Sequence, residues 1–271
     1  MPTAENPVAL VTGASSGMGK DIAERLLEAG YGVYAGARRV ERMVDLEKIG
    51  ATAIALDVTD DASMVRAIDR ITQESGRINV LVNAAGYGQY GALEDVPMAE
   101  ARRQLETNVI GIGRLVQLCL PMMRARGSGR IINISSIGGK FALPLGGWYH
   151  ASKFALEGYS DALRNEVRQF GVDVVVIEPG GIETEWESIA GQSASRVSGD
   201  GPYGDMVAKF RKMQGRKAPP PSVVSDMVMK AINARRPATR YSGGLAARPL
   251  LFLRRLLSDR MFDRLVMTAF R

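Results

Sequence analysis

Residues 8–19 read VALVTGASSGMG, an apolar run that passes into three glycines, and the helical run 20–29 follows directly. Glycine lets the backbone turn sharply and come close to a diphosphate, and free amides at a helix N-terminus bind negative charge. The spacing G-x-x-x-G-x-G differs from the common G-x-G-x-x-G fingerprint, but the order of strand, turn and helix is the one that a dinucleotide-binding turn requires. The stretch predicts a phosphate-binding turn, and an ordinary glycine-rich β–α turn is the alternative.

Short aliphatic runs alternate with helical stretches from this turn to about residue 180. We expect strands at residues 8–12, 32–35, 53–56, 80–83, 130–134 and 172–177. Nearly continuous apolar strands suit a parallel sheet that is covered on both faces, and the alternation with helices requires right-handed crossovers. The predicted fold class is therefore α/β, a single doubly wound Rossmann-type domain over residues 1–244 with a parallel sheet flanked by helices.

The composition excludes several other kinds of site. The 271 residues carry a net charge of +6 without a long basic run, so no nucleic-acid binding is expected. Cys119 is the only cysteine and His150 the only histidine, which leaves no internal disulfide and too few ligands for a zinc site, so no metal is expected. The cysteine usage favours a cytoplasmic protein. Residues 1–7 do not read as a secretory signal, and the apolar stretches are too short to span a membrane.

The end of the second expected strand indicates which dinucleotide would bind. A domain that binds NAD usually carries an acidic residue there for the ribose hydroxyl, whereas arginine suits a 2′-phosphate. Ala37 stands in the place of the acid, and Arg38 and Arg39 follow at once. These two residues favour NADP(H), unless they merely begin a solvated helix in which Glu41 neutralises one of them.

Tyr149 and Lys153 are the strongest candidates for proton chemistry. They are four residues apart in an expected helix, so both side chains lie on one face. A phenol has an ordinary pKa near 10, and a nearby ammonium group lowers it. Ser136 follows an expected strand and stands thirteen residues before Tyr149, so its hydroxyl can lie beside the phenol. An exposed helix pair without a catalytic role is the alternative.

Taken together, these motifs resemble the classical short-chain dehydrogenase/reductase family. The resemblance covers about residues 7–240, and the motifs occur in the order that the family shows. They are Thr12-Gly13-x-x-x-Gly17-x-Gly19, Asp57-Val58, Asn83-Ala84-Ala85-Gly86, Asn108, Ser136, Tyr149-x-x-x-Lys153 and Pro179-Gly180.

The resemblance implies a role for each residue of the catalytic set. Tyr149 would exchange a proton with the substrate oxygen, and Lys153 would hold the nicotinamide ribose and lower the pKa of the tyrosine. Ser136, rather than Ser135, would hydrogen-bond the substrate carbonyl. Asn108 would hold an ordered water that links Lys153 to solvent.

The resemblance also implies where the cofactor would lie. Asp57 and Val58 match a contact with adenine, residues 83–86 match a segment that braces the sheet beside the cofactor, and Ile182 and Thr184 match positions that hold the nicotinamide carboxamide. The cofactor-binding residues expected on these grounds are Gly13, Ser15, Ser16, Gly17, Met18, Gly19, Arg38, Arg39, Asp57, Val58, Asn83, Ala84, Ala85, Gly86, Tyr149, Lys153, Pro179, Gly180, Ile182 and Thr184.

The function expected from this set is an NADP(H)-dependent oxidoreductase that interconverts a ketone or aldehyde and an alcohol, on a small and hydrophobic substrate. Hydride transfer would be completed by tyrosine acid/base catalysis, with carbonyl reduction as the working direction. A homo-oligomer, dimer or tetramer, is expected as well. The alternatives are a non-catalytic NADP(H)-binding regulatory protein and an epimerase or dehydratase that recycles its cofactor internally.

Two segments lie outside the strand and helix alternation. Residues 186–221 are expected as a lid over the site, with a loop-like stretch at 188–201, a helix at 203–214 and a further helix capped at Ser222, or else as a surface excursion without a role. Residues 245–271 are expected as a basic amphipathic helical tail with six arginines. This tail could pack on its own domain, close a dimer or contact an anionic membrane surface.

A few residues invite other chemistry. His150 is expected to face away from Tyr149, as a helix-surface or interface histidine, because neighbouring helix positions point about 100° apart. Ser136 has no G-x-S-x-G elbow around it, so a hydrolase is not expected. Cys119 lies in an apolar helical stretch and is expected in the core, whereas Trp186 and Met206 could line a substrate pocket or merely pack.

Overall fold

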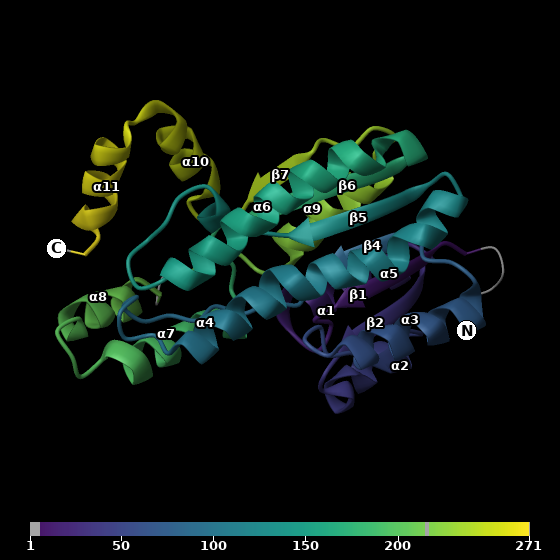
Figure 1. The fold of residues 1–271 in the computed structure, drawn as a ribbon, viewed down its shortest axis with the longest axis horizontal. Helices are drawn as coiled ribbons and strands as arrows, with labels where there is room; N and C mark the ends of the chain where they lie inside the picture. The colour runs from purple at the N-terminus through teal and green to yellow at the C-terminus, as the bar shows by residue number, and fades with distance from the viewer. Residues whose placement is uncertain (1–5, 215–216, 271) are drawn as a thin grey trace.

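The computed structural model describes residues 6–214 and 217–270, and its centre is one seven-stranded sheet (Figure 1). The strand order is β3-β2-β1-β4-β5-β6-β7, and every neighbouring pair is parallel. The strands are β1 (Val8–Thr12), β2 (Gly32–Ala37), β3 (Thr52–Ala55), β4 (Val80–Asn83), β5 (Gly129–Ile134), β6 (Val172–Pro179) and β7 (Arg240–Gly243). The doubly wound α/β prediction is confirmed.

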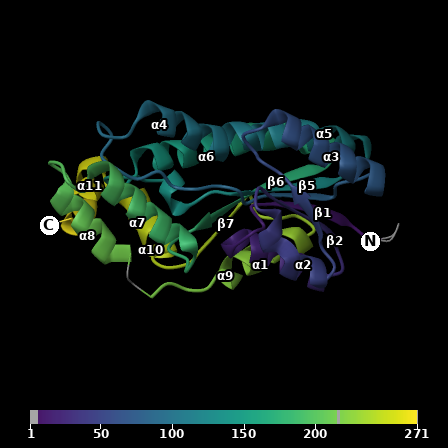
Figure 2. The same cartoon turned by 90° about the horizontal axis from the view of Figure 1, so that it is seen from below.

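Helices cover both faces of this sheet, which gives three layers (Figure 2). One face carries α3 (Asp61–Ser75), α5 (Gly111–Ala125) and α6 (Gly147–Val167), with α4 (Met98–Leu105) beside them. The other face carries α1 (Gly17–Glu28), α2 (Val44–Lys48) and α9 (Ser222–Asn233). Short helical turns complete the connections: η1 (Val40–Met43), η2 (Glu106–Ile110), η3 (Ile137–Gly139) and η4 (Arg168–Phe170).

The sheet separates two aliphatic cores. Successive side chains of a strand point to opposite faces, so Ala9 and Val11 pack with α1 and α9 while Val8 and Leu10 pack with α3 and α5. All residues of β1 are buried, which explains why its sequence is apolar throughout rather than alternating. Cys119 is fully buried in the second core, as expected.

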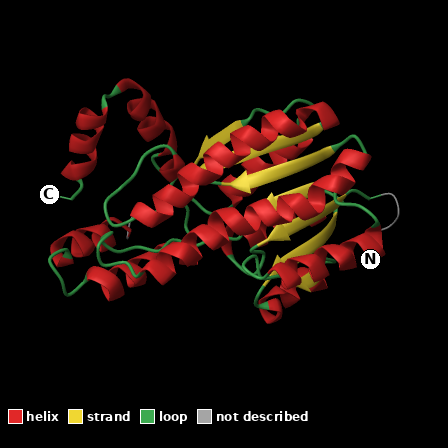
Figure 3. Ribbon diagram, in the orientation of Figure 1, coloured by secondary structure: helices red, strands yellow, loops and turns green. Residues whose placement is uncertain are grey.

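The carboxyl ends of the strands all point toward the remaining helices (Figure 3). These are α7 (Glu185–Ser198), α8 (Gly204–Gln214), α10 (Ala247–Leu256) and α11 (Asp259–Thr268). In an open α/β sheet, ligands bind beyond this edge. The four helices therefore border the edge at which the predicted site residues lie.

The prediction of a loop-like stretch at residues 188–201 is wrong, because most of this segment belongs to α7. Serines on this helix pair with the backbone of another segment: the Ser193 hydroxyl donates to the Tyr90 carbonyl at 3.0 Å and accepts from its amide at 3.2 Å. The Ser198 hydroxyl accepts from the Ala92 amide at 2.9 Å. Tertiary hydrogen bonds thus stabilise a helix whose composition does not favour one.

Three further predictions need correction. Strand β7 has no counterpart among the predicted strands, and it extends the sheet beyond β6. Ser222 is the first residue of α9 rather than its cap, a position that Pro221 occupies. The tail is two helices, because the backbone of Leu257 is extended between α10 and α11. Arg271, one of the six tail arginines, lies outside the described residues.

Candidate active site

The predicted phosphate turn connects β1 to α1 by a close backbone approach. Gly13 has a φ of +69°, and a Cβ there would lie 2.8 Å from the Cα of Ala85. A Cβ on Gly19 would lie 2.4 Å from the Gly13 carbonyl oxygen. Ser16 is the N-cap of α1 but its side chain makes no capping hydrogen bond, so it leaves the amides of the first turn available to a ligand. This arrangement suits an anion.

The 83–86 segment is held against this turn by one hydroxyl. The Thr12 Oγ1 accepts from the amides of Ala84 and Ala85 at 3.1 and 3.0 Å. Next to this segment, the buried side-chain amide of Asn83 donates to the side-chain oxygen of Asn133 at 2.8 Å. These contacts place the segment beside the phosphate turn.

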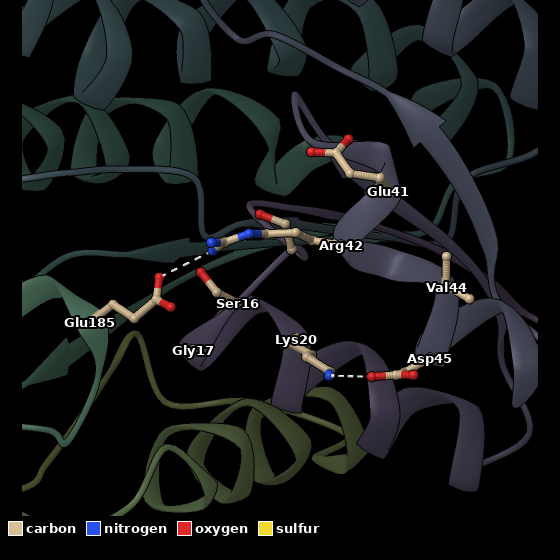
Figure 4. A pocket seen from close by; sticks show the side chains of 9 residues that line it. Ser16, Gly17, Lys20, Glu41, Arg42, Val44, Asp45 and Glu185 are labelled. Carbon is tan, nitrogen blue, oxygen red and sulfur yellow. Dashed lines mark hydrogen bonds and ion pairs between the residues drawn. The ribbon is translucent and has the colours of Figure 1, made fainter.

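A pocket of about 410 Å³ opens beside the turn and is lined by Ser15, Ser16 and Gly17 together with charged side chains (Figure 4). Arg42 pairs with Glu185 at 3.4 Å and Lys20 pairs with Asp45 at 3.4 Å. Sequence reasoning missed these four residues, because it considered only the arginines directly adjacent to the second strand.

The other expected cofactor residues are distributed around this edge. Arg38 and Arg39 are exposed at the end of β2, whereas the partly buried Met18 side chain packs against the core. Asp57 follows β3, and its carboxylate accepts from the Thr59 amide at 2.9 Å. Val58 is buried beside it.

The segment after β6 joins the two ends of the site. Gly180 donates its amide to the Gly243 carbonyl at 2.8 Å, and Ile182 is buried in the first core. Thr184 is the N-cap of α7, and its methyl group would be 3.4 Å from a Cβ placed on Gly17. The start of α7 therefore touches the phosphate turn.

Tyr149 lies in the first turn of α6 and is only 8% exposed. Burial raises the pKa of its phenol to about 12, and hydrogen bonding with the Ser136 hydroxyl lowers it in part. Ser136 stands where β5 ends, and its hydroxyl also accepts from the Gly138 amide at 3.0 Å and donates to the Pro179 carbonyl at 3.4 Å. The phenol and the Ser136 hydroxyl are thus brought together, whereas the Ser135 hydroxyl is buried without a hydrogen-bond partner.

Lys153 is buried one helical turn after Tyr149. Its ammonium donates to the Ile134 carbonyl at 2.8 Å and lies 5.9 Å from the centre of the Tyr149 ring. Burial lowers the pKa of Lys153 to about 8, and the charge of Glu157, one turn further along, opposes this shift. Glu157 was not predicted, although its spacing of four from Lys153 could have indicated it.

The expectation that Lys153 makes the phenol unusually acidic is wrong for this structure. The pKa of Tyr149 is raised, because removal from water penalises the phenolate more than the surroundings stabilise it. The ammonium is directed at the Ile134 carbonyl. The phenol is consequently protonated at neutral pH.

Asn108 lies in η2, where the helix widens to a π-helical turn between α4 and α5. Its side chain is fully buried, donates to the Ser152 hydroxyl at 3.0 Å and to the Tyr87 carbonyl at 3.1 Å, and accepts from the Tyr87 amide at 3.3 Å. Such turns are frequent at functional sites. The side chain oxygen lies 3.2 Å from the place of a Cβ on Gly86, so Asn108 belongs to the wall of the site.

His150 is buried, so the prediction of a surface or interface histidine is wrong. Its Nε2 accepts from the Leu143 amide at 3.0 Å, and its Nδ1 bonds to the Gly138 carbonyl at 2.9 Å. Burial lowers the pKa of the imidazole. His150 thus holds the 138–146 loop, which connects Ser136 to Tyr149.

Aromatic side chains cover Tyr149. The Trp186 ring lies 5.2 Å from the Tyr149 ring, and the Tyr90 ring lies 5.8 Å from it. Phe210 stacks on Tyr90 at 4.9 Å, and Met206 packs against the same cluster. Trp186 and Met206 come from α7 and α8, so these helices form an apolar cover over the phenol.

Among the described residues, no three histidine, cysteine or acidic side chains are grouped so as to hold a metal ion. No helix within 6–214 or 217–270 is long and apolar enough to cross a membrane.

Comparison with known families shows to which family this chain belongs. The family model for short chain dehydrogenases matches residues 7–193. The chain belongs to the classical short-chain dehydrogenase/reductase family, and it is an oxidoreductase of that family.

Three relatives show how far the similarity extends. A probable short-chain type dehydrogenase/reductase of Helicobacter pylori is 35% identical over 271 residues, covering 95% of this chain and 96% of its own. An NADPH-dependent 3-dehydrocapnine reductase of Ornithobacterium rhinotracheale is also 35% identical and covers 95% of both chains. A 3-ketodihydrosphingosine reductase of Bacteroides thetaiotaomicron is 44% identical over 178 residues, which are 65% of this chain and 64% of its own.

Solved structures share the same architecture. A short-chain dehydrogenase of Streptomyces avermitilis superposes with a TM-score of 0.78 at 36% identity and covers 89% of each chain. A variant of an actinorhodin polyketide ketoreductase with NADPH superposes with a TM-score of 0.76 at 30% identity, over 89% of this chain and 97% of the other.

Proposed function

We propose that this protein is an NADPH-dependent reductase that converts a ketone or aldehyde of a hydrophobic substrate into an alcohol. The observation that carries the proposal is the Tyr149 phenol, which is buried beneath aromatic side chains and lies near enough to the Ser136 hydroxyl for that group to lower its pKa. A hydroxyl pair in an apolar site suits a carbonyl oxygen on which negative charge develops.

The residues around the turn fit a dinucleotide phosphate. The close approach of Gly13 to the 84–85 segment leaves no room for a side chain, and the N-terminus of α1, which Ser16 does not cap, follows in the same turn. We assign the diphosphate to residues 13–19, and the 2′-phosphate to Arg38 and Arg39 because their guanidinium groups are exposed beside this edge.

The rest of the proposed cofactor contact follows the same edge of the sheet. It comprises Asp57, Val58, Asn83, Ala84, Ala85, Gly86, Tyr149, Lys153, Pro179, Gly180, Ile182 and Thr184. Bound NADPH would supply hydride to the carbonyl carbon.

The chain's own residues would manage the proton. Tyr149 holds its proton at neutral pH because its pKa is about 12, so it can donate to the substrate oxygen as negative charge develops there. Ser136 would donate a second hydrogen bond to this oxygen. Lys153 would supply positive charge behind the phenol, and Asn108 would hold the water that connects Lys153 to solvent. A protonated phenol supports reduction as the working direction, since alcohol oxidation requires the phenolate.

The apolar cover supports a hydrophobic substrate. Tyr90 and Trp186 pack on the Tyr149 ring, and Phe210 stacks on Tyr90. Two relatives carry 3-ketodihydrosphingosine and 3-dehydrocapnine in their names. A ketone on a long alkyl chain is therefore the first substrate to test, and we propose segment 186–221 as the part that moves to admit it.

The test is consumption of NADPH, followed by absorbance, with 3-ketodihydrosphingosine and a series of ketones of increasing chain length. Tyr149→Phe should reduce turnover at least about a hundredfold, because it removes the proton donor while keeping the ring. Its affinity for NADPH should stay close to that of the wild type. Comparable turnover in the variant would refute the proposed acid.

The same assay separates the alternatives. A regulatory protein would bind NADPH and consume none with any carbonyl compound. An epimerase or dehydratase would form product without net turnover of free cofactor. Either result would overturn the proposed reduction.

We also propose a cytoplasmic homo-oligomer, a dimer or tetramer. Exposed apolar side chains on neighbouring elements support a contact between copies, since Ile110 of η2 is 56% exposed and Phe154 of α6 is 46% exposed. Light scattering coupled to size exclusion would measure the mass, and a monomer at all concentrations would contradict the proposal.

A further inference from the structure

Helices α10 and α11 form a V that extends beyond the sheet, and α10 contacts β7 (Figure 1). The inner side of this V is packed on the domain. The Phe262 ring lies 5.2 Å from the Phe141 ring, and Phe270 is only 5% exposed. The ammonium of Lys209 in α8 donates to the Phe270 carbonyl at 3.1 Å. Packing on its own domain, one of the three alternatives for the tail, therefore explains the contacts of this inner side.

Both helices also carry apolar residues that are exposed to solvent, and we call this set the outer face. Phe252 and Leu256 are four residues apart in α10 and are 63% and 64% exposed. Met261 and Leu265 are four residues apart in α11 and are 51% and 36% exposed. Residues with this spacing lie on one face of a helix. Each helix thus presents an apolar stripe to solvent.

Arginines flank both stripes. Residues 247–268 contain five arginines and two aspartates, so their net charge is 5 − 2 = +3. One arginine, Arg254, is engaged within the tail, because it pairs with Asp259 at 2.7 Å and lies over the Phe262 ring. The others, Arg248, Arg255, Arg260 and Arg264, are exposed. Exposed apolar side chains bordered by cations are the pattern of an interfacial helix.

We propose that this outer face, formed by Phe252, Leu256, Met261 and Leu265 and their flanking arginines, docks on the surface of an anionic lipid bilayer. The apolar stripes would enter the boundary between headgroups and acyl chains, and the arginines would contact phosphate groups. A second copy of the chain fits this face less well, because a two-fold contact would bring the same cationic patches together. Charge complementarity favours the bilayer.

Flotation of the full-length protein with vesicles tests this proposal. Binding should be strong to vesicles of phosphatidylglycerol mixed with phosphatidylcholine, weak to phosphatidylcholine alone, and should fall as salt is raised. Vesicle binding requires no turnover, so its outcome is independent of the proposed reaction.

Variants with matched controls locate the contact. Phe252→Ser with Leu256→Ser should weaken binding by at least about tenfold, because it removes the apolar stripe of α10. The control is Ile49→Ser with Met98→Ser, since these side chains are 55% and 52% exposed elsewhere, and it should bind like the wild type.

The charge is tested separately. Arg255→Gln with Arg260→Gln should weaken binding about 25-fold, at about fivefold for each charge near an anionic surface. Arg126→Gln with Arg168→Gln removes two exposed arginines elsewhere and should have a much smaller effect. All variants change exposed residues, and thermal unfolding checks that each is folded.

Three results would overturn the proposal. The first is no binding of the wild type to the anionic vesicles at low salt. The second is equal loss of binding in the tail variants and in their controls. The third is a change of mass on size exclusion when Phe252 and Leu256 are replaced, without any change in vesicle binding, which would assign the face to a second copy of the chain.

Discussion

Acidification should destabilise this protein through His150. The Leu143 amide donates to Nε2 of the buried imidazole, so Nε2 carries no proton and Nδ1 donates to the Gly138 carbonyl. A second proton would place an N–H against the N–H of Leu143 and a charge in a buried site. Both effects disfavour the protonated form, in agreement with a pKa that burial lowers from its ordinary value of 6.5.

The magnitude follows from the two hydrogen bonds. Replacement by an apolar side chain, His150→Leu, leaves a part-buried amide and a buried carbonyl without their partner. An unsatisfied buried group costs about 1–3 kcal/mol and a part-buried group costs less, so the free energy of unfolding should fall by roughly 2–4 kcal/mol at neutral pH.

The pH dependence has a definite sign. Because the folded pKa lies below the unfolded value, the stabilisation is fully present above about pH 6.5 and is lost as the pH falls through the folded pKa. The loss has a limiting slope of about 1.4 kcal/mol per pH unit. His150→Leu should lack this component and remain sensitive only to the carboxylates at lower pH.

The assay is direct because the chain has one histidine. The imidazole gives a single C2 proton signal in NMR, whose titration in the folded protein should have a midpoint below 6.5. Urea unfolding across the same pH range measures the stability. An imidazole that titrates at or above its ordinary value, or parallel stability curves for wild type and variant, would refute the reasoning.

Three further predictions concern other parts of the molecule. Arg38→Ala with Arg39→Ala should lower the preference for NADPH over NADH by about tenfold or more in binding titrations, and an unchanged preference would refute the 2′-phosphate assignment. Thr12→Val should lower the urea-unfolding free energy by roughly 2–4 kcal/mol, because the two amides of the 84–85 segment lose their acceptor. Cys119, whose thiol has a pKa raised by burial to about 12, should react with a thiol reagent only on unfolding, and rapid labelling of the native protein would contradict its core position.

Apolar strands and glycine turns were the parts of the fold that sequence reasoning predicted well. The run 172–177 predicts most of β6 because a strand buried on both faces must be apolar almost throughout. Strand β7 lacks this signal, since its residues Arg240–Gly243 are only half-buried at the edge of the sheet and include a glycine. Helix α7 was missed for another reason: its serines are satisfied by the backbone of a distant segment, which a local pattern does not reveal.

The candidate site, too, was predicted from the sequence only in part. The motif spacing predicts that Tyr149, Lys153 and Ser136 lie close together, because a strand end and a helix start meet at the carboxyl edge of the sheet. The pKa of the phenol could not be predicted in this way. It depends on Trp186 and Tyr90, which come from segments far apart in the sequence and remove water from the ring.

Helix α7 touches both ends of the site. Its N-cap Thr184 lies against Gly17 of the phosphate turn, its Glu185 pairs with Arg42, and its Trp186 covers the phenol. Three consecutive residues therefore contact both the proposed cofactor site and the Tyr149 side chain. If the proposed function is correct, a movement of α7 would open the cofactor site and the carbonyl site together, so that entry of the two substrates would be interdependent.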